Sequence, residues 1–114
     1  MDHEAVLQKI RAFRDERDWM QFHNPKDLAA ALAIEASELQ EIFLWKKGVE
    51  IDETAQKKRA EIEDEVADIA TFLFEFADVL GIDLEAAILG KIERNAAKYP
   101  VEKARGSNAK YTDL

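Results

Sequence analysis

The chain has 114 residues, the size of a single domain. It is 47% hydrophobic and 35% charged, with no cysteine, which is typical of an ordered helical protein and excludes disulfides and thiolate metal sites. The net charge of −8 argues against binding along a nucleic-acid backbone, and no stretch resembles a membrane span or an export signal. We therefore expect one cytoplasmic domain over residues 1–114 that binds neither nucleic acid nor membrane.

Start and stop signals in the first half predict two helices. Asp2 can cap a helix that runs to about residue 18, with apolar residues at helical spacing along it. Asn24 followed by Pro25 combines a capping residue with proline at the first helical position, so it predicts the start of a second helix. This helix should run to about residue 47, since Gly48 is a C-terminal stop signal.

Two further helices are predicted after a short loop at residues 48–53 (GVEIDE). Asp52 can cap a third helix that reaches about residue 80, and Asp83 can cap a fourth. The fourth should end near residue 98, because Pro100 disfavours helical geometry at the residue before it. Residues 98–114 read as a polar tail. We predict an all-α fold, a four-helix bundle followed by this C-terminal tail.

The second helix carries carboxylates on its apolar face. At about 100° per residue, Glu35 falls in the middle of the apolar stripe and Glu38 at its edge, about 60° away. The third helix repeats this arrangement with Glu65 in the middle and Asp68 at the edge. The flanking apolar residues are Leu28, Leu32, Leu39 and Ile42 in the second helix, and Ile62, Ile69, Phe72 and Phe76 in the third.

Two such pairs indicate a metal site. A single Glu-x-x-Glu on a helix is usually a solvated acidic surface, but burying four carboxylates around one seam requires positive charge to compensate. Oxygen ligands without Cys favour magnesium or manganese. A di-iron site of the ferritin type needs Glu-x-x-His, and neither His3 nor His23 lies three residues after a Glu. Magnesium that keeps open positions favours a phosphorylated substrate.

The spacing of these two pairs resembles the signature of the all-α nucleoside triphosphate pyrophosphatases of the MazG type. The segments ERDWMQFHNPKDL (16–28), LQEIFLWK (39–46) and YPVEKARGSNAKYTDL (99–114) closely resemble the dCTP pyrophosphatase branch of that family. The resemblance implies magnesium-dependent hydrolysis of a deoxynucleoside triphosphate, dCTP or a related one, to the monophosphate and pyrophosphate, as a house-cleaning activity on the nucleotide pool. Manganese is expected to substitute for magnesium.

The resemblance also implies roles for individual residues. Glu35, Glu38, Glu65 and Asp68 match the family's metal ligands. Glu38 is the first choice for the general base and Glu41 the second, since an acidic group beside the metal can take the proton of water. Substrate contacts are expected from His23, Trp45, Phe72, Lys91, Arg94, Asn95, Tyr99, Lys110 and Tyr111. Phe72 stands where eukaryotic relatives tend to have tyrosine, so base preference is less firmly predicted than the chemistry.

The third predicted helix bears on assembly. Its segment IATFLFEFADVL (69–80) is apolar nearly all round, which indicates cover on two faces. We expect a homo-oligomer, and the resemblance implies a tetramer built from two dimers. Two other interpretations stay open: a non-catalytic helical module that binds nucleotide or another protein, and a metal-dependent phosphatase that releases orthophosphate.

Overall fold

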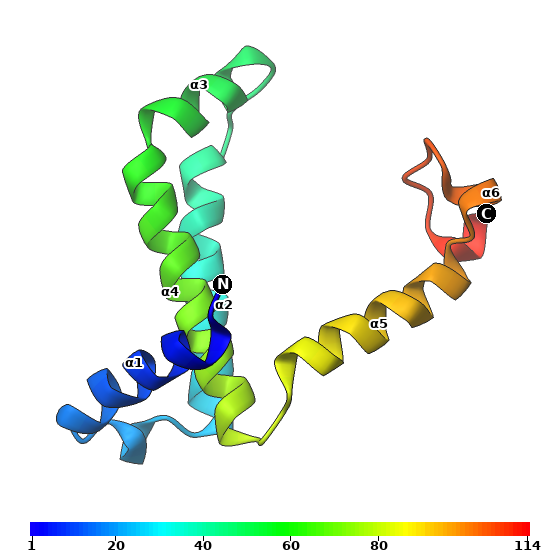
Figure 1. Cartoon of the computed structure of the whole chain (residues 1–114). Helices are drawn as coiled ribbons and strands as arrows, with labels where there is room; N and C mark the ends of the chain where they lie inside the picture. The colour runs from blue at the N-terminus through cyan, green and yellow to red at the C-terminus, as the bar shows by residue number, and fades with distance from the viewer. The chain divides into compact units, whose positions relative to one another are not determined.

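The computed structural model describes all residues, Met1–Leu114, and is helical throughout (Figure 1). Two compact units make up the chain, Met1–Gly81 and Ile82–Leu114. Every helix is either too short or too polar to cross a lipid bilayer. The elements in chain order are α1 (His3–Glu16), the 3₁₀ turn η1 (Met20–Phe22), α2 (Pro25–Phe43), α3 (Val49–Lys57), α4 (Arg59–Val79), α5 (Leu84–Lys98), α6 (Val101–Ala104) and the 3₁₀ turn η2 (Tyr111–Asp113).

Three of the four predicted helix starts are confirmed by their caps. The side chains of Asp2, Asn24 and Asp83 each accept a hydrogen bond from the backbone N–H three residues later, at 3.0, 2.9 and 3.0 Å. Pro25 occupies the first turn of α2, where its missing N–H costs nothing. These local signals fix where α1, α2 and α5 begin.

The predicted loop at residues 48–53 is wrong, because most of it belongs to the helix α3. Gly48 adopts a φ of 55°, which only glycine tolerates readily, and α3 starts directly after it with Glu50 and Asp52 in its first turn. The predicted third helix is also divided. Lys58, with φ −105° and ψ 26°, separates α3 from α4. The tail, predicted to be without regular structure, contains α6 and η2.

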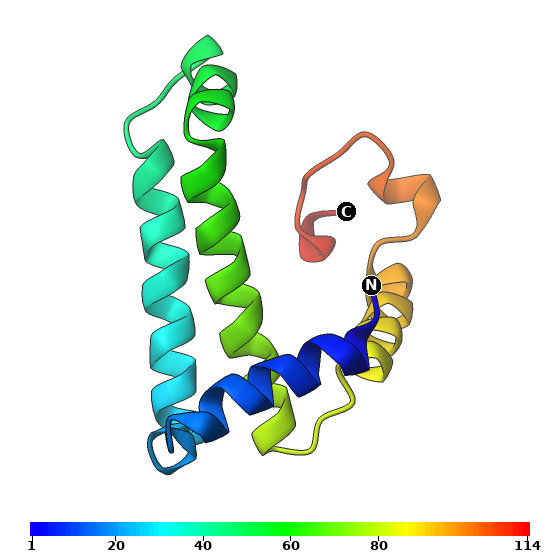
Figure 2. The ribbon, with the colours of Figure 1, turned by 60° about the vertical axis from the view of Figure 1, so that its left-hand side comes forward.

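Helices α2 and α4 form the centre of the first unit. They run antiparallel and side by side, with α3 at one end of the pair, as both ribbon views show (Figures 1 and 2). Leu28 on α2 and Ala77 on α4 are the buried apolar residues, 1% and 5% exposed. Because α2 and α4 pack side by side, the helix faces that carry Glu35, Glu38 and Glu65 come together.

Helix α1 crosses α4 and is tied to it by charge (Figure 2). Arg11 donates two hydrogen bonds to the carboxylate of Asp78, one of them from Nε at 3.0 Å. This guanidinium holds the pKa of Asp78 below its usual range. The neighbouring Arg14 is buried and donates from Nε to Asp15 at 2.9 Å. Ion pairing thus supports the packing of α1.

The second unit folds its tail against the end of α5. The ring of Tyr111 meets that of Tyr99 edge to face, with 5.9 Å between centroids, and Lys98 Nζ lies 4.9 Å from the Tyr111 ring centre. These contacts give the polar C-terminal segment a defined position within its own unit.

Candidate functional site

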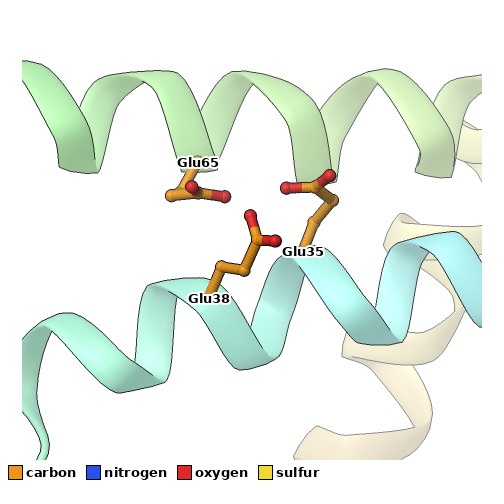
Figure 3. Close-up of side chains that lie close together, drawn as sticks. All are labelled: Glu35, Glu38 and Glu65. Carbon is orange, nitrogen blue, oxygen red and sulfur yellow. The ribbon is translucent and has the colours of Figure 1, made fainter.

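Three carboxylates meet between α2 and α4. Glu35 and Glu38 extend from α2 toward Glu65 on α4, and the side chains point at one another (Figure 3). One carboxylate oxygen from each of the three lies within 4.8 Å of the others. We call these residues the acidic group. Because i and i+3 lie on one helix face, α2 supplies two carboxylates to the same seam.

Two oxygens of the acidic group have no partner in the protein. Oε2 of Glu35 and Oε2 of Glu65 are fully buried, and neither has a hydrogen-bond partner. Buried polar atoms in proteins are nearly always hydrogen-bonded or bound to an ion. With only oxygen donors present, the group fits a hard divalent cation such as Mg²⁺ or Mn²⁺.

The close approach of these carboxylates raises the pKa of both Glu35 and Glu65. The pKa of Glu35 is raised to about 7, because its protonated carboxyl can share a hydrogen bond with Glu65, because it is partly removed from water, and because Glu38 and Asp68 are negative. The hydrogen bond with Glu35 lowers the pKa of Glu65, but burial and the charges of Glu38 and Asp68 outweigh it and leave that pKa raised. Near neutral pH the pair therefore favours either a proton or a cation.

Asp68, the fourth predicted metal ligand, lies outside the group of three. It follows Glu65 by one turn of α4 and is exposed. Its charge still raises the pKa of both Glu35 and Glu65, which places it near the group. The structure thus brings three of the four predicted ligands together and leaves Asp68 beside them.

A cavity of about 580 Å³ adjoins the acidic group, and we call it the acidic cavity. Glu41, the second choice for a general base, lines it together with Glu38 and Glu65. Lys58 is the one cation in its wall, and the break between α3 and α4 places it there. The sequence offered no signal for Lys58, since neither glycine nor proline marks that break. The full lining is Glu38, Glu41, Ile42, Lys58, Glu61, Asp64 and Glu65.

Three predicted substrate contacts belong to the first unit. Trp45 is 83% exposed and has a φ of 66°, a left-handed conformation that non-glycine residues rarely adopt and that often marks a binding segment. Phe72 is half-buried on α4, one turn after Asp68. His23 follows η1 and lies beside α4. None of these three residues lines the acidic cavity.

The other six predicted contacts lie in the second unit. Lys91 and Asn95 are four residues apart on α5, so they share one face of that helix. Tyr99 and Tyr111 touch one another, as described above. The role of all six toward the acidic group stays a prediction. They are Lys91, Arg94, Asn95, Tyr99, Lys110 and Tyr111.

Glu75 is a buried carboxylate that the sequence interpretation missed. It is 4% exposed, and its Oε2 lies 2.8 Å from His23 Nδ1. Burial raises the pKa of Glu75, and this outweighs the opposite influence of His23 and Arg14. A signal was present, because Glu75 is the single glutamate within the apolar run 69–80. A glutamate at such a position indicates a buried carboxylate, as it did for Glu35 and Glu65.

Comparisons with known proteins agree on one family. The MazG-like family model matches residues 30–114, which include all four predicted metal ligands and the whole second unit. The chain is 41% identical to rat dCTP pyrophosphatase 1 and 38% identical to the human protein, in both cases over 97% of this chain and 69% of the relative. The crystal structure of a pyrophosphatase from Archaeoglobus fulgidus matches with a TM-score of 0.83 and 40% identity, covering 85% of this chain and 91% of that one. These similarities confirm the predicted all-α class and the resemblance drawn from the motifs.

Proposed function

The chain belongs to the MazG-like family, and on that premise we propose that it is a nucleoside triphosphate pyrophosphatase. It would cleave a deoxynucleoside triphosphate between the α and β phosphates and release the monophosphate and pyrophosphate. The observation that carries this proposal is the acidic group, in which Glu35 and Glu65 each present a buried oxygen without a partner. dCTP is the first substrate to test, because the similar rat and human proteins are named for it.

We propose that Glu35, Glu38 and Glu65 hold Mg²⁺, with Mn²⁺ as a substitute and Asp68 as a further ligand. When bound, the cation would polarise the phosphate and offset the negative charge that develops as pyrophosphate leaves. The carboxylates themselves fix the place of the reaction, because both α2 and α4 are needed to assemble them. Attack at the α-phosphorus would therefore occur along the α2–α4 seam.

The acidic cavity offers a place for the attacking water and the leaving group. Glu38 borders both the acidic group and the cavity, so it is our choice to take the proton of the water. Glu41, one turn later in the same cavity wall, is the second choice. Lys58, at the break between α3 and α4, can donate hydrogen bonds to phosphate oxygens in this cavity.

The substrate contacts complete the proposal. We propose that residues 1–114 serve a single activity. We further propose nucleotide contacts for His23, Trp45 and Phe72 in the first unit and, separately, for the six polar and aromatic residues of the second unit. Support comes from the family match over residues 30–114, which includes all of these residues except His23. We place this activity in the cytoplasm, where it would remove unwanted deoxynucleotides.

Exposed apolar side chains favour self-association. In the first unit, Phe22, Ile34 and Val66 are 61%, 59% and 50% exposed. Large apolar surfaces on a soluble protein usually mark contacts with another chain. We propose a homo-oligomer, with a tetramer of two dimers as the expected form. Light scattering coupled to size-exclusion chromatography would give the mass in solution, and a stable monomer at micromolar concentration would contradict the assembly.

A panel of nucleoside triphosphates tests the activity. With Mg²⁺ present, we expect pyrophosphate and a nucleoside monophosphate from dCTP and at least one related deoxynucleotide. Chelation with EDTA should abolish the reaction. Orthophosphate in place of pyrophosphate would favour the phosphatase alternative. Binding of nucleotide without any product would favour the non-catalytic module.

A further inference from the structure

A second cavity, of about 440 Å³, lies between α1 and α4 and has a different character. We call it the α1–α4 cavity. Its α1 side is formed largely by apolar side chains, whereas α4 contributes polar groups, among them Asp68 and Glu75. Such walls suit a flat ring that needs apolar contact on its faces and a polar group at its edge. The lining residues are Val6, Lys9, Ile10, Phe13, Asp68, Thr71 and Glu75.

Glu75 is the buried polar group of this cavity. Its side chain is 5% exposed, and its Oε2 lies 2.8 Å from His23 Nδ1 but has no hydrogen-bond partner in the protein. Two further charged residues, Lys9 and Asp68, line the same cavity. The neighbouring Arg14 and Asp78 are already paired. Arg14 pairs with Asp15, and Asp78 pairs with Arg11. A carboxylate offers about four acceptor positions, so Glu75 keeps capacity for a donor inside the cavity.

The cavity starts next to the acidic group. Asp68 lines it and follows Glu65 of the acidic group by one turn of α4. Glu75 follows Asp68 by seven residues, which corresponds to about 10 Å along α4 at ~1.5 Å per residue. This length is comparable to that of a nucleoside from its 5′-oxygen to the far edge of a pyrimidine. A nucleotide whose phosphates reach the acidic group can thus direct its base edge toward Glu75.

We propose that Glu75 is a specificity-determining residue that selects cytosine over uracil at this base edge. Cytosine carries an amino group at position 4, which donates to a carboxylate. Uracil carries a carbonyl oxygen there, which would leave Glu75 unpaired and place two acceptors against each other. Uracil is disfavoured because its carbonyl and the Glu75 carboxylate both lose contact with water and form no hydrogen bond in return. This inference rests on the proposed pyrophosphatase function.

The test compares dCTP with dUTP. We expect the wild-type chain with Mg²⁺ to show a higher kcat/KM for dCTP, and Glu75→Gln to reduce the dCTP/dUTP ratio by about tenfold or more, since an amide can also donate to a carbonyl. Asp78→Asn is the matched control. It removes a part-buried carboxylate of the same helix that does not line the cavity, so it should lower stability and leave the ratio unchanged.

The outcomes are separable. An unchanged ratio in a folded Glu75→Gln variant would overturn the inference, as would an equal fall in Asp78→Asn. If Glu75→Gln does not fold, the wild-type comparison decides, because equal kcat/KM for dCTP and dUTP contradicts selection by Glu75. Absence of pyrophosphate from both nucleotides with the wild-type chain would overturn the proposed function, and the inference with it.

Discussion

Glu35 and Glu65 approach each other across the α2–α4 pair, and each has a fully buried Oε2 without a hydrogen-bond partner (Figure 3). Two ionised carboxylates in this position repel one another and lose hydration at the same time. The arrangement is stabilised when a proton or a cation joins them. The same relationship thus connects metal binding, pH and stability in this protein.

Neutralising Glu35 should abolish activity but raise the stability of the metal-free protein. We expect Glu35→Gln to abolish pyrophosphate release, because the amide is a weaker ligand for a divalent cation. In EDTA the variant should melt at a higher temperature than the wild type, because repulsion with Glu65 is removed. Glu63→Gln is the control, since Glu63 is exposed and pairs with Arg59 at 2.9 Å. Full turnover in Glu35→Gln would show that Glu35 is not a ligand.

The pH dependence of stability follows from the raised pKa of Glu35. Its folded-state pKa of about 7 lies above the ordinary value of 4.5, so the folded chain binds more protons than the unfolded chain between these values. The free energy of unfolding of the metal-free protein should therefore fall as pH rises from about 4.5 to 7. The raised pKa values of Glu65 and Glu75 act in the same direction.

Thermal melts in EDTA at about pH 5 and pH 8 measure this effect. In separate melts without EDTA, added Mg²⁺ should raise the melting temperature more at pH 8 than at pH 5, because protons no longer compete for the carboxylates at pH 8. In the Glu35→Gln variant, the melting temperature in EDTA should change less between pH 5 and pH 8. Asp78 does not interfere, because its pKa is lowered from 3.8 and its change falls below this window. A metal-free wild type that gains stability from pH 5 to pH 8 would contradict the account.

The core of the first unit depends strongly on Leu28. This side chain is 1% exposed, so Leu28→Ala should reduce the free energy of unfolding by about 3 kcal/mol through lost burial and the cavity left behind. Leu44→Ala, at a residue that is 48% exposed, should cost less than about 1 kcal/mol. Urea denaturation at a fixed protein concentration would compare them. Equal losses would indicate that Leu28 does not anchor the α2–α4 packing.

The pairing of Arg11 with Asp78 should contribute measurably to the docking of α1. The two side chains are 32% and 18% exposed, so part of the interaction is shielded from water. Asp78→Asn should cost about 1 to 2 kcal/mol after allowance for solvent screening. A double-mutant cycle with Arg11→Ala would isolate the coupling. Additive losses would show that the pair contributes no interaction energy.

The sequence predicted the features that depend on neighbouring residues, such as the helix starts. Asp2, Asn24 and Asp83 signalled helix starts because a side-chain cap depends on only a few neighbouring residues. The acidic group could be expected from helical periodicity, since Glu35 and Glu65 each fall in the middle of an apolar stripe and the stripes of paired helices must face each other.

Features that depend on tertiary packing were not predictable in this way. The break at Lys58 lies between two segments with good helical propensity and contains neither glycine nor proline, so nothing local marks it. The contact between His23 and Glu75 joins residues 52 positions apart, as their numbers show, and depends on the position of η1 against α4. Asp68 followed the same sequence pattern as Glu38, yet the structure leaves it outside the group of three.

The central claim is that carboxylates from α2 and α4 jointly hold one divalent cation site. Calorimetric titration of the metal-free chain with Mn²⁺ tests it most directly, using the wild type, Glu35→Gln, Glu65→Gln and the exposed control Glu63→Gln. We predict binding to the wild type and to Glu63→Gln, and at least about tenfold weaker binding when either Glu35 or Glu65 is neutralised. Equal Mn²⁺ affinity in all four proteins would contradict the claim.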